Sequence, residues 1–102
     1  MSSINKSVAF IALVEAWEES PTGMVTRRQV WEKIKEIWWD RISPEADLHL
    51  AHILNHWVDG KCLVRHSGKY YRRGKQWSTL TKQYATIINQ FQKAKEVRDA
   101  LL

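Results

Sequence analysis

The highest density of charge in the sequence lies between Lys61 and Lys75. Six side chains in this stretch are cationic and none is acidic. Each Lys or Arg can neutralise a phosphate, so this density is typical of proteins that bind a polyanion such as nucleic acid. Protection of an exposed hairpin edge is the alternative use of such charges. We predict that the hairpin tip enters the minor groove of DNA and that phosphates are contacted through Lys61, Arg65, Lys69, Arg72, Arg73 and Lys75.

Charge is unevenly divided along the chain. The 102 residues carry a net charge of +5. Residues 1–60 hold six basic and nine acidic side chains, whereas residues 61–102 hold ten basic and two acidic ones. A surface that serves only solubility mixes the two signs, as the first sixty residues do. The separation therefore places the contact with a polyanion in the second part of the chain.

Three histidines, His49, His52 and His56, recur at the spacing of one helix face. A pair four residues apart, such as His52 and His56, can share a divalent metal ion. Three positions spread over two turns of one helix seldom converge on one ion, so we predict no metal site and no cofactor. We expect the histidines instead to bond base edges in a DNA groove together with Asn55, which would bind adenine.

Nothing in the sequence supports catalysis. No nucleophile elbow, phosphate-binding Gly-rich loop or pair of acids stands in a recognisable context, so we predict that the protein is not an enzyme. The single cysteine, Cys62, has no partner for a disulfide, which fits a reducing compartment. The longest apolar run, residues 8–14, is far shorter than the roughly 18 residues of a membrane span. We expect a cytoplasmic, nucleoid-associated protein without a membrane segment.

The histidines and Asn55 lie on a third predicted helix, which follows a second one. A very short strand at residues 24–25 precedes the second helix, which begins with a capping box between Thr26 and Gln29 and ends near residues 39–40. The third helix runs from its cap at Ser43 to residue 59. Backbone N–H groups at the start of the second helix favour anions, so further phosphate contacts are expected from Arg27 and Arg28.

A hairpin follows the third helix. Residues 62–66 and 69–73 are rich in β-formers and flank a two-residue turn at residues 67–68. That turn pairs Val64 with Tyr71 on one face and Arg65 with Tyr70 on the other.

The first and last helices carry the longest apolar patterns. The first is predicted over residues 4–19, and its middle is apolar on every side, so two of its sides need cover. From residues 78–79 to the end, apolar residues recur at spacings of four and three, as in a coiled-coil seam. Left alone this seam would expose a large apolar stripe, so we predict pairing with a second copy. Packing on its own domain and binding another protein are the alternatives. The interface is predicted to contain Phe10, Leu80, Tyr84, Ile87, Ile88, Phe91, Ala94 and Leu101.

The order helix, short strand, helix, helix, hairpin resembles that of the winged helix-turn-helix family. The most specific stretch is residues 54–72, LNHWVDGKCLVRHSGKYYR. It looks like the end of a recognition helix, a glycine turn, and a wing whose second strand carries an aromatic pair. The resemblance covers residues 4–75 and is one of pattern, and the connection over residues 39–43 is longer than the tight turn of the plain motif.

The resemblance implies a mainly α fold with a small β-hairpin, in the α+β class. Residues 1–77 would form a winged-helix DNA-binding domain and residues 78–102 a C-terminal dimerisation helix. The function implied is sequence-specific binding of double-stranded DNA by a homodimeric transcriptional regulator. The third helix carries neither Lys nor Arg between residues 44 and 59, which leaves two alternatives open. One is an adaptor whose third helix binds a protein partner, and the other is a sequence-neutral architectural DNA-binding protein.

Overall fold

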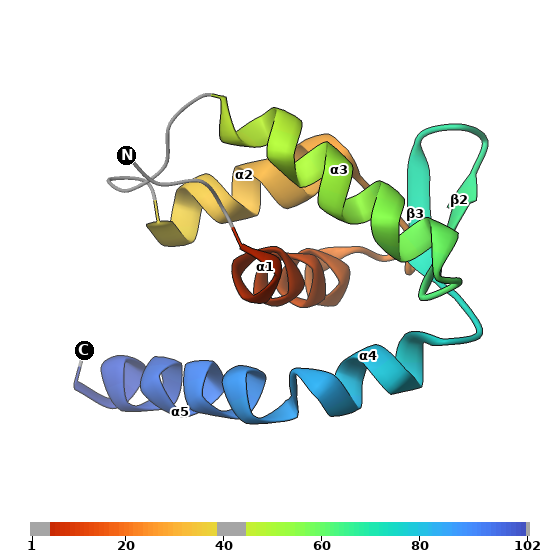
Figure 1. The fold of residues 1–102 in the computed structure, drawn as a ribbon. Helices are drawn as coiled ribbons and strands as arrows, with labels where there is room; N and C mark the ends of the chain where they lie inside the picture. The colour runs from red at the N-terminus through yellow and green to blue at the C-terminus, as the bar shows by residue number, and fades with distance from the viewer. Residues whose placement is uncertain (1–4, 39–44, 102) are drawn as a thin grey trace.

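The computed structural model describes residues 5–38 and 45–101. The fold is mainly α with one small antiparallel sheet of strand order β1-β3-β2, which confirms the predicted class. Helix α1 lies between the α2–α3 pair and the α4–α5 pair, with the sheet at one end (Figure 1). The elements are α1 (Lys6–Glu19), β1 (Val25–Thr26), α2 (Arg27–Trp38), α3 (Ala46–Asp59), β2 (Leu63–His66), β3 (Tyr70–Arg73), α4 (Trp77–Gln83) and α5 (Ala85–Leu101).

Most predicted boundaries agree with these elements. Helix α3 ends at Asp59 with Gly60 as its cap, as expected. The predicted end of the second helix at residues 39–40 and the predicted cap at Ser43 lie outside the described residues. No helix in the described parts of the chain is long and apolar enough to cross a membrane.

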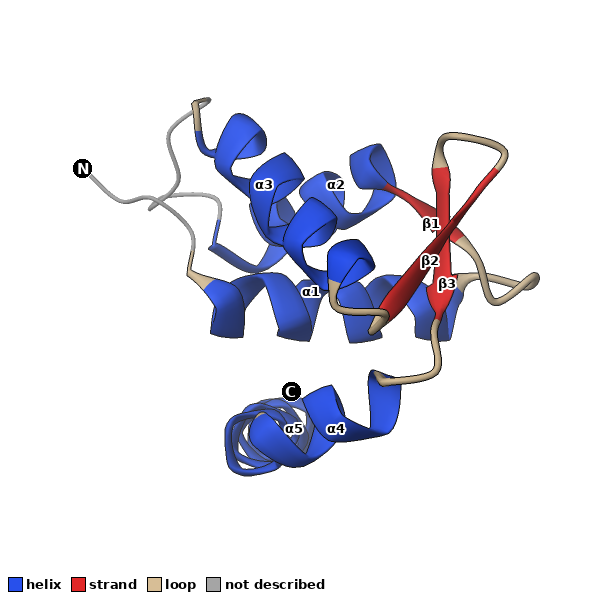
Figure 2. Cartoon of the chain, turned by 45° about the vertical axis from the view of Figure 1, so that its right-hand side comes forward, coloured by secondary structure: helices blue, strands red, loops and turns tan. Residues whose placement is uncertain are grey.

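Helix α1 is covered on two sides, as its sequence predicts. The Asn5 side chain accepts a hydrogen bond of 2.9 Å from the Val8 N–H and so caps the first turn. Every residue from Ala9 to Leu13 is buried, which places apolar side chains on all sides of the helix in the core. Figure 2, turned from the first view, keeps α2 and α3 on one side of α1 and α4–α5 on the other.

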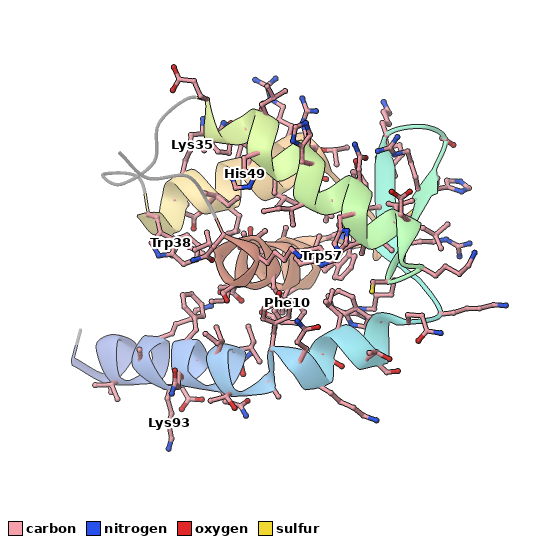
Figure 3. All side chains as sticks on the ribbon, viewed as in Figure 1. Phe10, Lys35, Trp38, His49, Trp57 and Lys93 are labelled. Atoms are coloured by element: carbon pink, nitrogen blue, oxygen red, sulfur yellow. The ribbon has the colours of Figure 1, made fainter. Side chains whose placement is uncertain are left out.

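The ring of Phe10 joins α1 to the C-terminal helices. It stacks on Trp77 with 5.3 Å between ring centroids and on Tyr84 with 5.0 Å. Trp77 also meets the edge of Trp17 at 4.8 Å. Figure 3 shows Phe10 between α1 and the α4–α5 pair. These aromatic contacts fix α4 against α1.

The C-terminal seam differs from the prediction in two ways. The single helix expected from residue 78 is divided at Tyr84, which has φ −107° and ψ 12°. Three residues assigned to a dimer interface, Phe10, Leu80 and Tyr84, are only 1%, 4% and 8% exposed within one chain. The reason is that α1 offers an apolar side that this chain's own helices cover. Ile88 and Phe91 are half-buried, Ile87 and Ala94 are exposed, and the side chain of Leu101 is outside the described ones.

The hairpin register is shifted by one residue from the predicted one. Ser67 and Gly68 both have positive φ, 55° and 76°, and the Lys69 N–H closes the turn on the His66 carbonyl at 3.3 Å. His66 nevertheless pairs with Tyr70, so Lys69 is an extra residue, a bulge. The predicted pairs Val64 with Tyr71 and Arg65 with Tyr70 are therefore wrong. Arg65 faces Tyr71 instead, and Val64 pairs with Arg72.

An ion pair between a half-buried lysine and a buried carboxylate joins α5 to α1. The Lys95 Nζ donates to Glu15 Oε1 at 2.8 Å, and the Glu15 residue is only 7% exposed. Burial raises the pKa of Glu15, but hydrogen bonds with Lys95 and Glu18 and the charges of Lys95 and Lys33 outweigh it, so the pKa lies below its usual value. Lys33 is buried beside Glu19 and Glu36 in the same region.

We expect Glu15→Gln to destabilise the protein by about 1–3 kcal/mol at neutral pH, because the hydrogen bond from Lys95 loses its charged acceptor. A lowered pKa means that the stabilisation by Glu15 is present above the ordinary value of 4.5 and is lost as pH falls below it. The deficit of the variant should therefore shrink in acid. Urea unfolding of the wild type and the variant, followed by Trp fluorescence at neutral and at acid pH, measures the difference in the free energy of unfolding.

Glu32→Gln is the matched control for this experiment. It removes a carboxylate from an exposed pair with Lys35 at 3.0 Å and should change stability by less than about 0.5 kcal/mol. A Glu15→Gln deficit of equal size at neutral and acid pH would contradict the expectation.

Candidate nucleic-acid interface

A groove of about 760 Å³ lies between α2, α3 and the β2–β3 hairpin. It collects residues that are up to 45 positions apart in the sequence, from Thr26 to Tyr71. Five cationic side chains and two acidic ones, Glu32 and Asp47, line it, so the groove is net positive. The cationic residues are Arg27, Arg28, Lys35, Arg65 and Lys69.

The start of α2 positions the first two of these cations. The Thr26 N–H donates to Gln29 Oε1 at 2.8 Å and the Gln29 N–H donates to Thr26 Oγ1 at 3.2 Å, which confirms the predicted capping box. This box starts the helix directly after β1 and holds Arg27 and Arg28 in its first turn. The Arg27 Nε lies 3.4 Å from Asp47 Oδ1, and this ion pair joins α2 to α3.

Arg65 of the hairpin forms hydrogen bonds with side chains on α3 and on β3. Its Nη2 donates to Asn55 Oδ1 on α3 and, at 3.1 Å, to Tyr71 Oη. Tyr71 is 5% exposed, and its main-chain carbonyl accepts a 3.2 Å hydrogen bond from Trp17 Nε1 in the core. Arg65 is therefore bonded both to the buried Tyr71 of β3 and to the exposed Asn55 of α3.

The register of the hairpin separates its cations onto two faces. Arg65 and Arg73 pair with Tyr71 and Leu63, whose burial places this face against the helices. The Arg73 Cζ lies 5.1 Å from the ring centroid of Trp17. Arg72 lies on the opposite, outer face beside Val64.

The groove brings together only some of the residues predicted from the sequence. Arg27, Arg28, Asn55, Arg65 and Lys69 line it, whereas the predicted Lys61, Arg72, Arg73 and Lys75 do not.

The three histidines also lie off the groove. At about 100° per residue, His49, His52 and His56 are about 60° to 120° further round α3 than Asn55. No histidine is among the described residues that line the groove. In the described parts of the chain, no three His, Cys, Asp or Glu side chains are grouped so as to hold a metal ion.

Several lining residues are not in the predicted set, among them the cation Lys35 and the aromatic Trp31. Lys35 follows Arg28 by seven positions, which places both on one face of α2. That spacing is the signal that could have found Lys35. Trp31 packs against the core while remaining half-buried.

No family model matches the sequence, and neither a curated protein nor a solved structure matches the chain. The interpretation of the groove therefore rests on its residues and their geometry.

We expect the two neighbouring arginines of β3 to differ in their effect on stability. Arg73→Ala removes a cation above the buried Trp17 ring and should lower the free energy of unfolding by about 0.5–1 kcal/mol. Arg72→Ala removes the same charge from the outer face and should stay within about 0.5 kcal/mol of the wild type. Chemical denaturation of both variants measures the difference, and an equal loss in the two would contradict the assignment of faces.

Proposed function

We propose that this protein binds double-stranded DNA, with the groove between α2, α3 and the hairpin against the duplex. The observation that carries the proposal is the convergence of five cationic side chains from α2 and the hairpin on one groove. A phosphate backbone attracts such a surface because binding releases condensed counterions.

The arrangement of the elements supports a winged-helix version of this proposal. They follow the order that the family resemblance implies, and β1 joins the hairpin in one sheet through pairing of Val25 with Tyr71. In this interpretation α3 is the recognition helix and β2–β3 is the wing. Because α3 lacks Lys and Arg, the phosphate contacts fall to α2 and the hairpin on its two sides. Asn55 is the exposed polar side chain of α3 that lies in the groove.

We propose sequence-specific transcriptional regulation as the role of this binding. Phosphate contacts position a protein on DNA, whereas contacts with base edges give specificity. The groove offers both kinds of contact, since Asn55 and Arg65 can bond base edges and the side chains around them are suited to phosphate. An architectural protein without sequence preference would need only the phosphate contacts.

A protein-binding adaptor is the second candidate, favoured by one observation on α3. Leu48 is 68% exposed, and the exposed acids Glu45 and Asp59 lie on the same arc of the helix. An exposed apolar residue among acids suits a basic protein partner better than it suits DNA.

The proposal is tested by the salt dependence of binding to a labelled mixed-sequence duplex, measured by fluorescence anisotropy. A variant with Arg28, Lys35 and Lys69 changed to Ala should bind more weakly, and its log–log salt slope should be shallower by about 2–3, at about 0.9 per lost phosphate contact. The matched control changes Lys6, Lys82 and Lys93 to Ala. These three are exposed outside the groove, and Lys93 projects away from the rest of the molecule (Figure 3).

The control removes the same number of charges and should keep most of the wild-type slope. Equal losses in the two variants would show that net charge and not the groove attracts DNA. Failure of the wild type to bind even at low salt would overturn the proposal in favour of a protein partner.

The homodimer predicted from the sequence stays a prediction, and fewer of its predicted interface residues are accessible, because Phe10, Leu80 and Tyr84 are buried within one chain. On the seam, Ile87 and Ala94 are exposed and seven residues apart on α5, so they share one face. If two copies pair through this face, Ile87→Glu should weaken self-association in sedimentation experiments, whereas Lys93→Glu should not. A wild type that remains monomeric at high concentration would remove the dimer, and a dimer insensitive to Ile87→Glu would place its interface elsewhere.

A further inference from the structure

Asn55 has a defined orientation because of the residue that holds it. Its Oδ1 accepts a hydrogen bond from Arg65 Nη2. An arginine side chain has only donors, so it can bind the carboxamide through the oxygen alone. The amide oxygen of Asn55 therefore points toward the hairpin, and its NH2 group points away from Arg65.

Arg65 is itself held in place. The same Nη2 donates to Tyr71 Oη at 3.1 Å, and the guanidinium carbon lies 5.5 Å from the centroid of the Tyr71 ring. Tyr71 is buried and is joined to Trp17 through its main chain. The bulge at Lys69 sets the register that places Arg65 directly opposite Tyr71. Two acceptors on separate elements thus hold one nitrogen of Arg65.

Together Asn55 and Arg65 present hydrogen-bond donors to the groove. The free hydrogens belong to the Asn55 NH2 group and to the remaining N–H groups of the guanidinium. An asparagine that binds adenine must accept from N6 and donate to N7 at once. Here the accepting oxygen is engaged by a cation, and the positive guanidinium beside it repels the partly positive amino group of adenine. Guanine instead offers two acceptors in the major groove, O6 and N7.

We propose that Asn55 and Arg65 act as one specificity-determining pair that selects guanine in the bound duplex. This inference rests on the proposed DNA binding and replaces the expectations that Asn55 binds adenine and that Arg65 contacts the minor groove. The pair reads the O6 and N7 edge, and Tyr71 is the positioning residue that keeps Arg65 against Asn55.

The first step of the test is selection of bound duplexes from a random pool by the wild-type protein. We expect an enriched motif that contains guanine, with at least one guanine position that becomes degenerate when selection is repeated with Asn55→Ala. At that position guanine should be preferred over adenine by about 5- to 150-fold in the wild type. Replacement of this guanine by 7-deazaguanine, which lacks the N7 acceptor, should weaken wild-type binding and leave Asn55→Ala unaffected.

Arg65→Lys separates specificity from phosphate binding. It keeps the positive charge but lacks the planar guanidinium that bonds Asn55 and Tyr71 at once. We expect the guanine preference, measured as the ratio of the affinities for the guanine and adenine duplexes, to be lost in Arg65→Lys. Lys82→Ala, on the exposed side of α4, serves as the control that keeps the wild-type ratio. Circular dichroism of each variant establishes that it is folded.

The outcomes separate this inference from the proposed function. No binding of the wild type to any duplex overturns DNA binding itself. Binding without an enriched motif, a preference for adenine, or a guanine preference that survives both Asn55→Ala and Arg65→Lys overturns the inference and leaves DNA binding intact. A guanine preference kept by Arg65→Lys and lost in Asn55→Ala also overturns it, because Asn55 would then read the base without Arg65.

Discussion

Helix α1 is apolar around its whole circumference, and a helix of that kind can be stable in water only when other elements enclose it. The buried run from Ala9 to Leu13 sets this requirement. Helices α2 and α3 enclose one side and α4–α5 the other (Figure 1). Helix α4 and Tyr84 are thus part of the core of the single chain, where Trp77 and Tyr84 stack on Phe10.

The same core determines the geometry of the groove. Trp17 on α1 bonds the main chain of Tyr71, and Tyr71 bonds Arg65, which in turn holds Asn55 on α3. A continuous series of contacts therefore runs from the buried helix to the exposed side chains. Because Arg65 and Asn55 hold one another, these two side chains lose less conformational entropy on binding a ligand than free side chains would.

Local signals in the sequence were enough to predict most of the elements. The capping box of Thr26 and Gln29, the stop at Gly60 and the cluster of cations after it depend only on neighbouring residues. The grouping of Arg28 with Arg65 could not be predicted, since it depends on how α2 packs against the hairpin. The periodicity of Leu80 and Tyr84 correctly indicated that their side chains are buried. Periodicity alone does not say whether the surface that covers them belongs to the same chain. The prediction of the hairpin register was wrong for a different reason. Ser67 and Gly68 both have the positive φ angles of a two-residue turn, and nothing in the sequence marks Lys69 as the extra residue.

The bulge at Lys69 decides which side chains of the hairpin lie opposite one another. Side chains alternate between the two faces of a strand, so a slip of one residue in the pairing gives every side chain a different partner across the hairpin. If Lys69 entered β3 opposite His66, Tyr71 would come opposite Val64, and Arg65 would lose Tyr71 as its partner. The exposed tip therefore controls the groove, because the contacts of Arg65 with Tyr71 and Asn55 require Lys69 to stay in the loop.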